Sequence, residues 1–254
     1  MEILSPAGNL EKLKIALAFG ADAVYMGLPE ISLRAGAESW TEEDIALLPY
    51  LLKTWNIQKD RKIYLTVNRY FHQSDLSVLH AARDKIGEQI FDALIISDLG
   101  ALRYLQKEFP ETDFHLSTQA NCTNSYAART YYDLGFSRIV AARELKIDEI
   151  GDIKSSVPEL EIEVFVHGAV CVAYSGRCIL SSWLSDRSAN KGACSHSCRW
   201  NYREFEEKKR PGMPLRVLEN DGYTTIFSPE DLCMISHLKD LESAQHFTKP
   251  PARF

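Results

Sequence analysis

Short apolar runs alternate with amphipathic segments at a regular step through the first two thirds of the chain, and this alternation narrows the folds open to it. Each apolar run has the length of a buried strand, and each segment between two runs has the apolar spacing of a helix. None of the runs leads into the G-x-G-x-x-G turn of dinucleotide-binding folds. Repeated single βα units therefore predict an α/β fold, a (β/α)8 barrel of the TIM type. The predicted strands lie at 2–5, 23–26, 63–67, 93–96, 114–117, 138–141 and 162–166.

The predicted barrel is truncated before its eighth strand. A helix is predicted over 228–243, where Ser228 is a suitable N-cap and Pro229 a suitable first residue. The remaining tail has two prolines and no apolar run. Three outcomes stay open: the barrel remains open, a partner or a second copy completes it through the unpaired edge, or the chain is part of a longer one. The predicted divisions are barrel strands at 1–170, a cysteine-rich insertion at 171–227, the barrel helix at 228–243 and an irregular tail at 244–254.

Polar side chains gather just after the predicted strands, where the carboxyl ends of barrel strands converge on one mouth and active sites lie. Arg143 is a candidate for holding a substrate carboxylate, because a guanidinium fork binds carboxylates bidentately. His167 is a candidate for proton transfer. Gln119 and Asn121 carry the donor and acceptor edges needed to read a base, and Glu163, on the seventh strand, is a candidate for orienting other groups. Helix caps, loop solvation or a buried salt bridge would use the same residues.

The cysteines are distributed as in a metal site. Five of the six lie in one stretch: Cys171, Cys178, Cys194, Cys198 and Cys233, with Cys122 well before them. Thiolates select zinc, copper(I) or iron–sulfur clusters. Only Cys194 and Cys198 have the short spacing of a zinc knuckle, while the wider Cys171-x6-Cys178 spacing suits a larger four-iron cube. Five thiols for four positions leave one as a spare, a redox partner or an exchanged ligand.

The context of these cysteines favours metal over disulfides. The chain begins without an apolar stretch behind a basic start, and no run approaches the ~20 apolar residues of a membrane span, so a cytoplasmic location is expected. Clustered cysteines in a reducing compartment more often bind metal or do redox chemistry than form bridges. The formal net charge of −6 argues against binding of nucleic acid by bulk charge alone, although basic and aromatic residues alternate between 187 and 216.

Several runs resemble those of the peptidase U-32 family, the collagenase-like proteases. The most specific is EVFVHGAVCVAYSGRCILS, from Glu163 to Ser181. The opening LSPAGN and GADAVYMGL runs, STQAN at 117–121 and ARELKIDEI from Ala142 are similar to the family too, so the resemblance extends to about Leu241. The later GACSHSCRWNY run is most similar to a branch that hydroxylates tRNA.

This resemblance implies RNA hydroxylation more than proteolysis. It implies 5-hydroxyuridine formation in tRNA, or 5-hydroxycytidine formation in ribosomal RNA, with prephenate as a small organic acid co-substrate and tRNA bound by the full-length form. It implies a 4Fe-4S cluster on Cys171, Cys178 and Cys194, completed by either Cys198 or Cys233. Relatives continue into a strand with an IEGR-like run that this chain lacks. Two alternatives stay open, a peptidase and a subunit whose structural zinc site supports binding to a partner through the open barrel edge.

Overall fold

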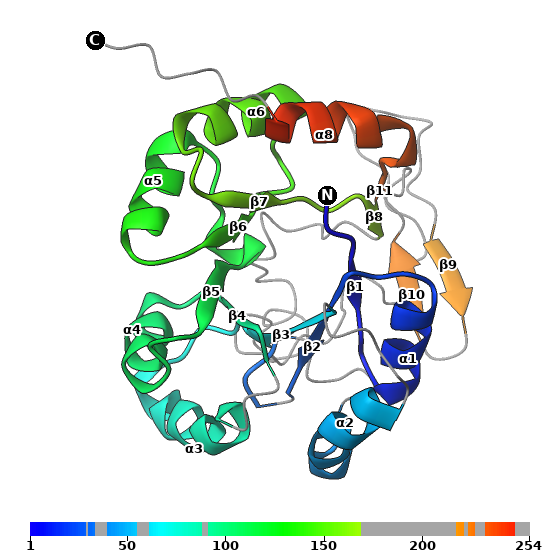
Figure 1. Ribbon diagram of the computed structural model, residues 1–254, viewed down its shortest axis with the longest axis vertical. Helices are drawn as coiled ribbons and strands as arrows, with labels where there is room; N and C mark the ends of the chain where they lie inside the picture. The colour runs from blue at the N-terminus through cyan, green and yellow to red at the C-terminus, as the bar shows by residue number, and fades with distance from the viewer. Residues whose placement is uncertain are drawn as a thin grey trace.

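Seven parallel strands form one curled sheet in chain order, and helices cover its outer face (Figure 1). The computed structural model describes residues 1–28, 30–33, 40–54, 61–87, 91–168, 217–220, 223–226 and 232–246. The strands are β1 (Leu4–Pro6), β2 (Ala23–Gly27), β3 (Lys62–Val67), β4 (Ala93–Ile96), β5 (Asp113–Leu116), β6 (Arg138–Val140) and β7 (Glu161–Glu163). Each pairs with the next in parallel register, and in the described part of the chain β1 and β7 each have one neighbour.

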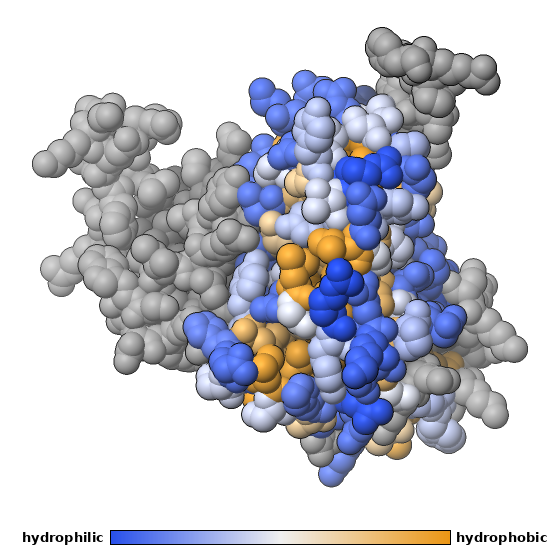
Figure 2. Space-filling model, turned by 90° about the vertical axis from the view of Figure 1, so that its left-hand side faces the viewer, coloured by the Kyte–Doolittle hydropathy of each residue, from blue (hydrophilic) through white to orange (hydrophobic). Residues whose placement is uncertain are grey.

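The helices follow the strands as the βα pattern predicts. They are α1 (Leu10–Ala18), α2 (Glu42–Thr54), α3 (Leu76–Ile86), α4 (Leu99–Glu108), α5 (Ser125–Asp133) and α6 (Ile147–Ser156), with α8 (Leu238–His246) beside α6. Side-chain caps fix where several of them begin: Asn9 accepts from the backbone of Lys12, Asp98 from Gly100, and Asn124 from Ala127. The face in Figure 2 is mostly hydrophilic with small apolar patches, as expected for the outer sides of amphipathic helices.

The two faces of the sheet differ in chemistry. Leu65, Leu94 and Leu116 point outward and are fully buried in the main core between sheet and helices. The alternate positions point inward and form a small second core around Ala93, Tyr64 and other residues. Charged and polar side chains share this inner face with them. The curled sheet therefore encloses a polar interior, and a half-barrel of the α/β class is what the chain forms.

The chain after β7 departs from the prediction. The predicted strand at 162–166 is β7 followed by an extended segment leading into β8 (His167–Gly168), and β8 pairs antiparallel with β11 (Leu232–Cys233). The predicted helix over 228–243 is wrong in its first part, because residues 232–233 are a strand, and α8 begins only at Leu238. A hairpin of β9 (Val217–Asn220) and β10 (Tyr223–Ile226) was not predicted. The helix α8 continues to His246, so the first three residues of the predicted irregular tail at 244–254 are helical. The rest of that tail and most of the predicted division at 171–227 lie outside the described residues and stay predictions.

Candidate functional site

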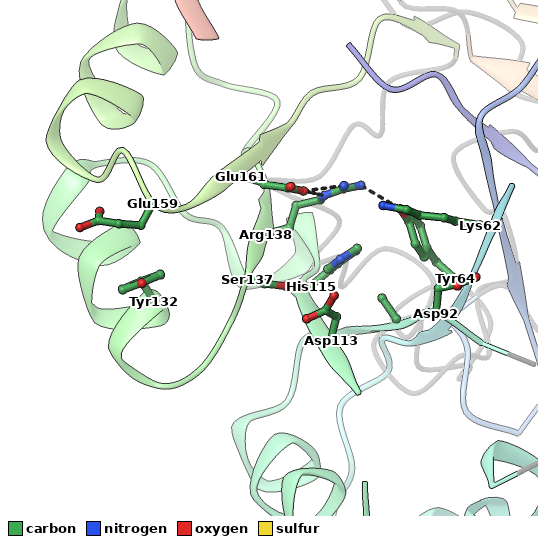
Figure 3. A pocket seen from close by; sticks show the side chains of 11 residues that line it. Lys62, Tyr64, Asp92, Asp113, His115, Tyr132, Ser137, Arg138, Glu159 and Glu161 are labelled. Carbon is green, nitrogen blue, oxygen red and sulfur yellow. Dashed lines mark hydrogen bonds and ion pairs between the residues drawn. The ribbon is translucent and has the colours of Figure 1, made fainter. Parts of the chain in front are cut away.

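A buried arginine organises the inside of the half-barrel. Arg138, the first residue of β6, is 8 % exposed. Its Nη1 atom donates to Glu2 Oε1 at 2.6 Å, and its Nε atom donates to Glu161 Oε2 at 2.7 Å. The same Nη1 atom lies 3.7 Å from Oε2 of Glu163. One guanidinium therefore faces three carboxylates, one from the segment before β1 and two from β7, and Figure 3 shows the contact with Glu161.

Two aromatic rings complete this interior cluster. The Tyr64 hydroxyl donates to Glu2 Oε1 at 2.9 Å, and the Arg138 guanidinium lies 5.3 Å from the centre of the Tyr64 ring. The His115 ring meets Tyr64 edge-on, with 4.7 Å between ring centres. Burial, assisted by the charge of Arg138, lowers the pKa of His115 to about 3, so its imidazole is neutral. Burial also raises the pKa of the Tyr64 hydroxyl above its ordinary value.

Glu163 differs from Glu2, the other partly buried carboxyl beside Arg138, in the direction of its pKa shift. Burial raises its pKa to about 7, and the attraction of Arg138 only partly offsets that rise. Its Oε2 atom is buried, and no hydrogen bond to it is made within the described part of the chain. For Glu2, burial also raises the pKa, but the hydrogen bond and charge of Arg138 outweigh it and the net pKa is lowered. The contact of Arg138 with Glu2, at 2.6 Å against 3.7 Å for Glu163, explains the difference. Glu163 is thus a proton-holding carboxyl near neutral pH.

Hydrogen bonds hold the loop after β5 against neighbouring loops at the carboxyl ends of the strands. Thr118 donates through Oγ1 to the carbonyl of Ala141 at 3.2 Å, and Tyr70 donates through its hydroxyl to the carbonyl of Gln119 at 2.9 Å. Gln119 is 9 % exposed, and its buried Oε1 atom has no hydrogen-bond partner among the described residues. Asn121 ends the short helical turn with φ at 57°, in the left-handed region. The loop therefore holds the side-chain amide of Gln119 in place at the predicted mouth of the barrel.

Arg143 and His167 lie beyond the ends of β6 and β7. The Arg143 guanidinium stacks over the Phe165 ring, 4.6 Å from its centre, which restricts the planar fork. His167 is exposed on β8, and its register partner across the strand pair is Cys233. The structure thus places Gln119 and Arg143 at the strand ends. Glu163 lies inside with Arg138, and His167 sits at the start of the separate β8–β11 pair.

Comparison with known proteins decides the family. Residues 8–246 match Peptidase family U32. The chain belongs to this family. It is similar to the tRNA hydroxylation protein P of Helicobacter pylori strain J99, with 41% identity over 96% of this chain and 57% of that protein. It is also similar to a collagenase of Porphyromonas gingivalis, with 34% identity over 96% of this chain and 58% of that protein. The chain spans a little over half the length of these relatives.

The fold also matches within the family. The solved structure of the U32 peptidase Mk0906 has a TM-score of 0.58 against this chain, covers 78% of it and 76% of its own chain, and is 12% identical. That likeness concerns the fold alone. Among the described residues, no helix is long and apolar enough to cross a membrane.

The cysteines of this U32 chain divide between described and undescribed parts. Those predicted as ligands, Cys171, Cys178, Cys194 and Cys198, lie outside the described residues. Cys122 is fully buried after β5, and burial raises the pKa of its thiol to about 11. Cys233 is exposed. Within the described ranges, no three His, Cys, Asp or Glu side chains are placed to hold a metal. The cluster therefore stays a prediction.

Sequence reasoning missed Arg138, the centre of the interior cluster. The signal was present, because a charged residue opening a short apolar strand must point inward or leave the sheet. Glu161 and Glu163, two residues apart on β7, fall on the same inner face by strand alternation. The pairing of these carboxylates with Arg138 requires the order of neighbouring strands, which local patterns do not give.

Proposed function

We propose that this chain is the cluster-binding half-barrel of a protein that hydroxylates uridine in tRNA, giving 5-hydroxyuridine with prephenate as co-substrate. The 41% identity with a tRNA hydroxylation protein over 96% of the chain carries the proposal. The collagenase relative matches the same share of the chain at 34% identity, which makes peptidase activity the second candidate. The activity is expected of the whole protein, because this chain spans 57% of the tRNA hydroxylation relative.

The architecture proposed for the whole protein is a (β/α)8 barrel. Both β1 and β7 keep a free edge in the described part of the sheet, and an eighth strand between them would close it. The cysteine-rich segment would follow strand seven and cover the carboxyl ends. Two supports for this arrangement are the parallel sheet in chain order and the position of β8 directly after β7.

Substrate contacts are proposed for the residues at the strand ends. Arg143, held flat over Phe165, would bind a carboxylate of the organic acid. Gln119 would read the uracil edge, because its side-chain amide carries both an acceptor and donors and the N3–H of uracil is a donor. Asn121 lies two residues along the same turn and would contact the same nucleotide. Glu163 would hold or release a proton inside the barrel, and His167 would do so at its rim.

A 4Fe-4S cluster is proposed on Cys171, Cys178 and Cys194, with Cys233 as the fourth ligand in preference to Cys198. The support for Cys233 is its place on β11, in register with His167, four residues before Cys171. Its exposed thiol is free of a disulfide. Such a cluster would supply electron transfer to the site. Zinc on the same thiolates is the alternative that metal analysis distinguishes.

The test uses the full-length protein in a bacterial strain deleted for its own tRNA hydroxylation genes. We expect the wild-type gene to restore 5-hydroxyuridine, measured by mass spectrometry of tRNA nucleosides, only when the strain makes prephenate. Purified anaerobically, the protein should contain matching iron and sulfide. Absence of the modified nucleoside together with cleavage of denatured collagen would reject hydroxylation in favour of the peptidase.

The cysteine variants provide the matched control. Cys171→Ser should lose iron and the modified nucleoside, because an iron is left without its thiolate. Cys122→Ser should keep both, since Cys122 is fully buried in the main core after β5, where its thiol contacts the carbonyl of Asn124 at 3.9 Å. Iron loss in the Cys122 variant and retention in the Cys171 variant would contradict the ligand assignment.

A further inference from the structure

One nitrogen of Arg138 lies between two carboxyl groups that reach it from opposite edges of the sheet. Its Nη1 atom donates to Glu2 Oε1 at 2.6 Å and lies 3.7 Å from Glu163 Oε2. The rest of the guanidinium is occupied, because Nε and Nη2 both contact Glu161. The Arg138 side chain is 9 % exposed, so water does not easily replace either carboxyl group. Glu2 and Glu163 therefore compete for the same part of one enclosed cation.

Glu2 holds the stronger position in this competition. Its Oε1 atom also accepts from the Tyr64 hydroxyl at 2.9 Å, and its Oε2 atom lies 3.5 Å from Nζ of Lys62. The Oε2 atom of Glu163 makes no hydrogen bond within the described residues. Burial raises the pKa of Glu163 to about 7, the attraction of Arg138 lowers it, and the negative charge of Glu2 raises it. The protonation of one carboxyl thus depends on a second carboxyl from a different strand.

The other ionisable groups on the inner face have less influence. Glu161 binds the guanidinium through Nε and Nη2, and its side chain is 61 % exposed, so solvent screens its charge. His115 is neutral, because burial lowers the pKa of its ring to about 3. Tyr64 is neutral too, because burial raises the pKa of its hydroxyl. Among the described residues, the charges that reach the β7 carboxyl are therefore those of Glu2 and Arg138.

We propose that Glu2 and Arg138 are positioning residues that set the pH at which Glu163 releases its proton inside the barrel. This role rests on the proposed function, in which Glu163 donates a proton to the site. Glu2 engages the Nη1 atom of Arg138 and thereby keeps Glu163 protonated. Without the charge of Glu2, Arg138 is free to pair with the Glu163 carboxylate. Because Glu2 precedes β1 and Glu163 lies on β7, this control operates only while the two edges of the sheet face each other.

The test is an infrared titration of the full chain between pH 5 and pH 9 that follows the carbonyl stretch of protonated carboxyl groups. Each protein is compared with the same protein carrying Glu163→Gln, so that the difference reports this carboxyl alone. We expect a wild-type midpoint at about pH 7. Glu2→Gln should lower the midpoint by about one pH unit, because glutamine accepts the same hydrogen bond without the charge. Arg138→Met should raise it by about one pH unit, because the attraction that lowers the pKa is removed.

Glu161→Gln is the matched control, since it removes a carboxylate from the same guanidinium on its exposed side. The midpoint of this variant should stay close to that of wild type. An unmoved or raised midpoint in Glu2→Gln, or equal shifts in Glu2→Gln and Glu161→Gln, would overturn the proposal. A general loosening of the interior would lower the midpoint in Arg138→Met as well, and that result would also overturn it. Glu2→Gln decides the question alone if Arg138→Met does not fold.

The strain assay connects this control to the reaction. With a midpoint one unit lower, the protonated share of Glu163 at neutral pH falls from about half to about a tenth. Glu2→Gln should therefore lower 5-hydroxyuridine about fivefold. A lowered midpoint with an unchanged nucleoside level would overturn the use of this proton in the reaction. Because the titration is read from the carboxyl itself, absence of hydroxylation in wild type as well would count against the proposed function and not against the control of Glu163 by Glu2.

Discussion

Replacing Glu163 with glutamine should stabilise the protein at alkaline pH. The pKa of Glu163 is about 7 in the folded chain and 4.5 in its ordinary state, so the folded state binds more protons between these values. Its stabilising contribution is fully present below pH 4.5 and is lost as pH rises through about 7. At about 1.4 kcal/mol per pKa unit, the full loss is about 3 kcal/mol. Since 18 % of the side chain is exposed, hydration reduces the expected effect to about 2 kcal/mol.

Urea unfolding followed by circular dichroism between pH 5 and pH 9 measures this effect. The free energy of unfolding of Glu163→Gln minus that of wild type should rise with pH and level off above pH 8. Taking the difference cancels His115, whose lowered pKa adds stability as pH rises toward 6.5 in both proteins. Glu159→Gln, which changes an exposed carboxylate paired with Arg129, is the control for the loss of a surface charge. A flat difference for Glu163→Gln would refute the buried, protonated carboxyl.

Three further changes test the structure. Arg143→Lys should lower the amount of modified nucleoside about tenfold with little change in melting temperature, because lysine keeps the charge and loses the planar fork. A large shift in melting temperature with normal activity would show that Arg143 is a structural residue. Arg138→Met should cost about 3–5 kcal/mol in urea unfolding, since it strands carboxylates inside the barrel, and an unchanged stability would contradict the ion cluster. Gly27→Ala should cost about 1–3 kcal/mol, because a Cβ there would approach Thr66 Oγ1 to 2.7 Å; wild-type stability would show that this contact relaxes.

Local patterns located most of the barrel elements. The strand predicted at 93–96 is β4, and the amphipathic segment that follows it is helix α4. A local signal coincides with the tertiary structure here: Asp98, two residues after the end of β4, caps α4 by accepting from the backbone N–H of Gly100. The family resemblance likewise rested on short runs that carry their own pattern. Such signals need no knowledge of which strands become neighbours.

Predictions failed where distant segments decide the structure. The residues at 232–233 have a helix-like pattern, yet they pair with β8 about sixty-five positions earlier in the chain. Met234 continues that pairing by donating to the carbonyl of Val166 at 2.8 Å. Backbone pairing with an available strand outweighs a weak local helix preference. The polar pocket at the amino ends of β3 to β7, lined among others by Lys62, Asp113 and Glu161, was missed for the same reason.

Through its side chain, Arg138 links the two edges of the curled sheet. Within the described residues, no backbone pairing joins these edges. Glu2 lies just before β1 and is 136 positions from Arg138, so their hydrogen bond joins the first strand to the sixth through the interior. Glu161 extends the same connection to β7. Removing either carboxylate partner would leave charge without its counter-charge in a low-dielectric space, which is costlier than the pair itself is favourable. The cluster therefore determines which strands face each other more than it increases the free energy of unfolding. It also leaves Glu163 the least compensated carboxyl of the three, which is why burial, more than attraction to Arg138, sets its pKa.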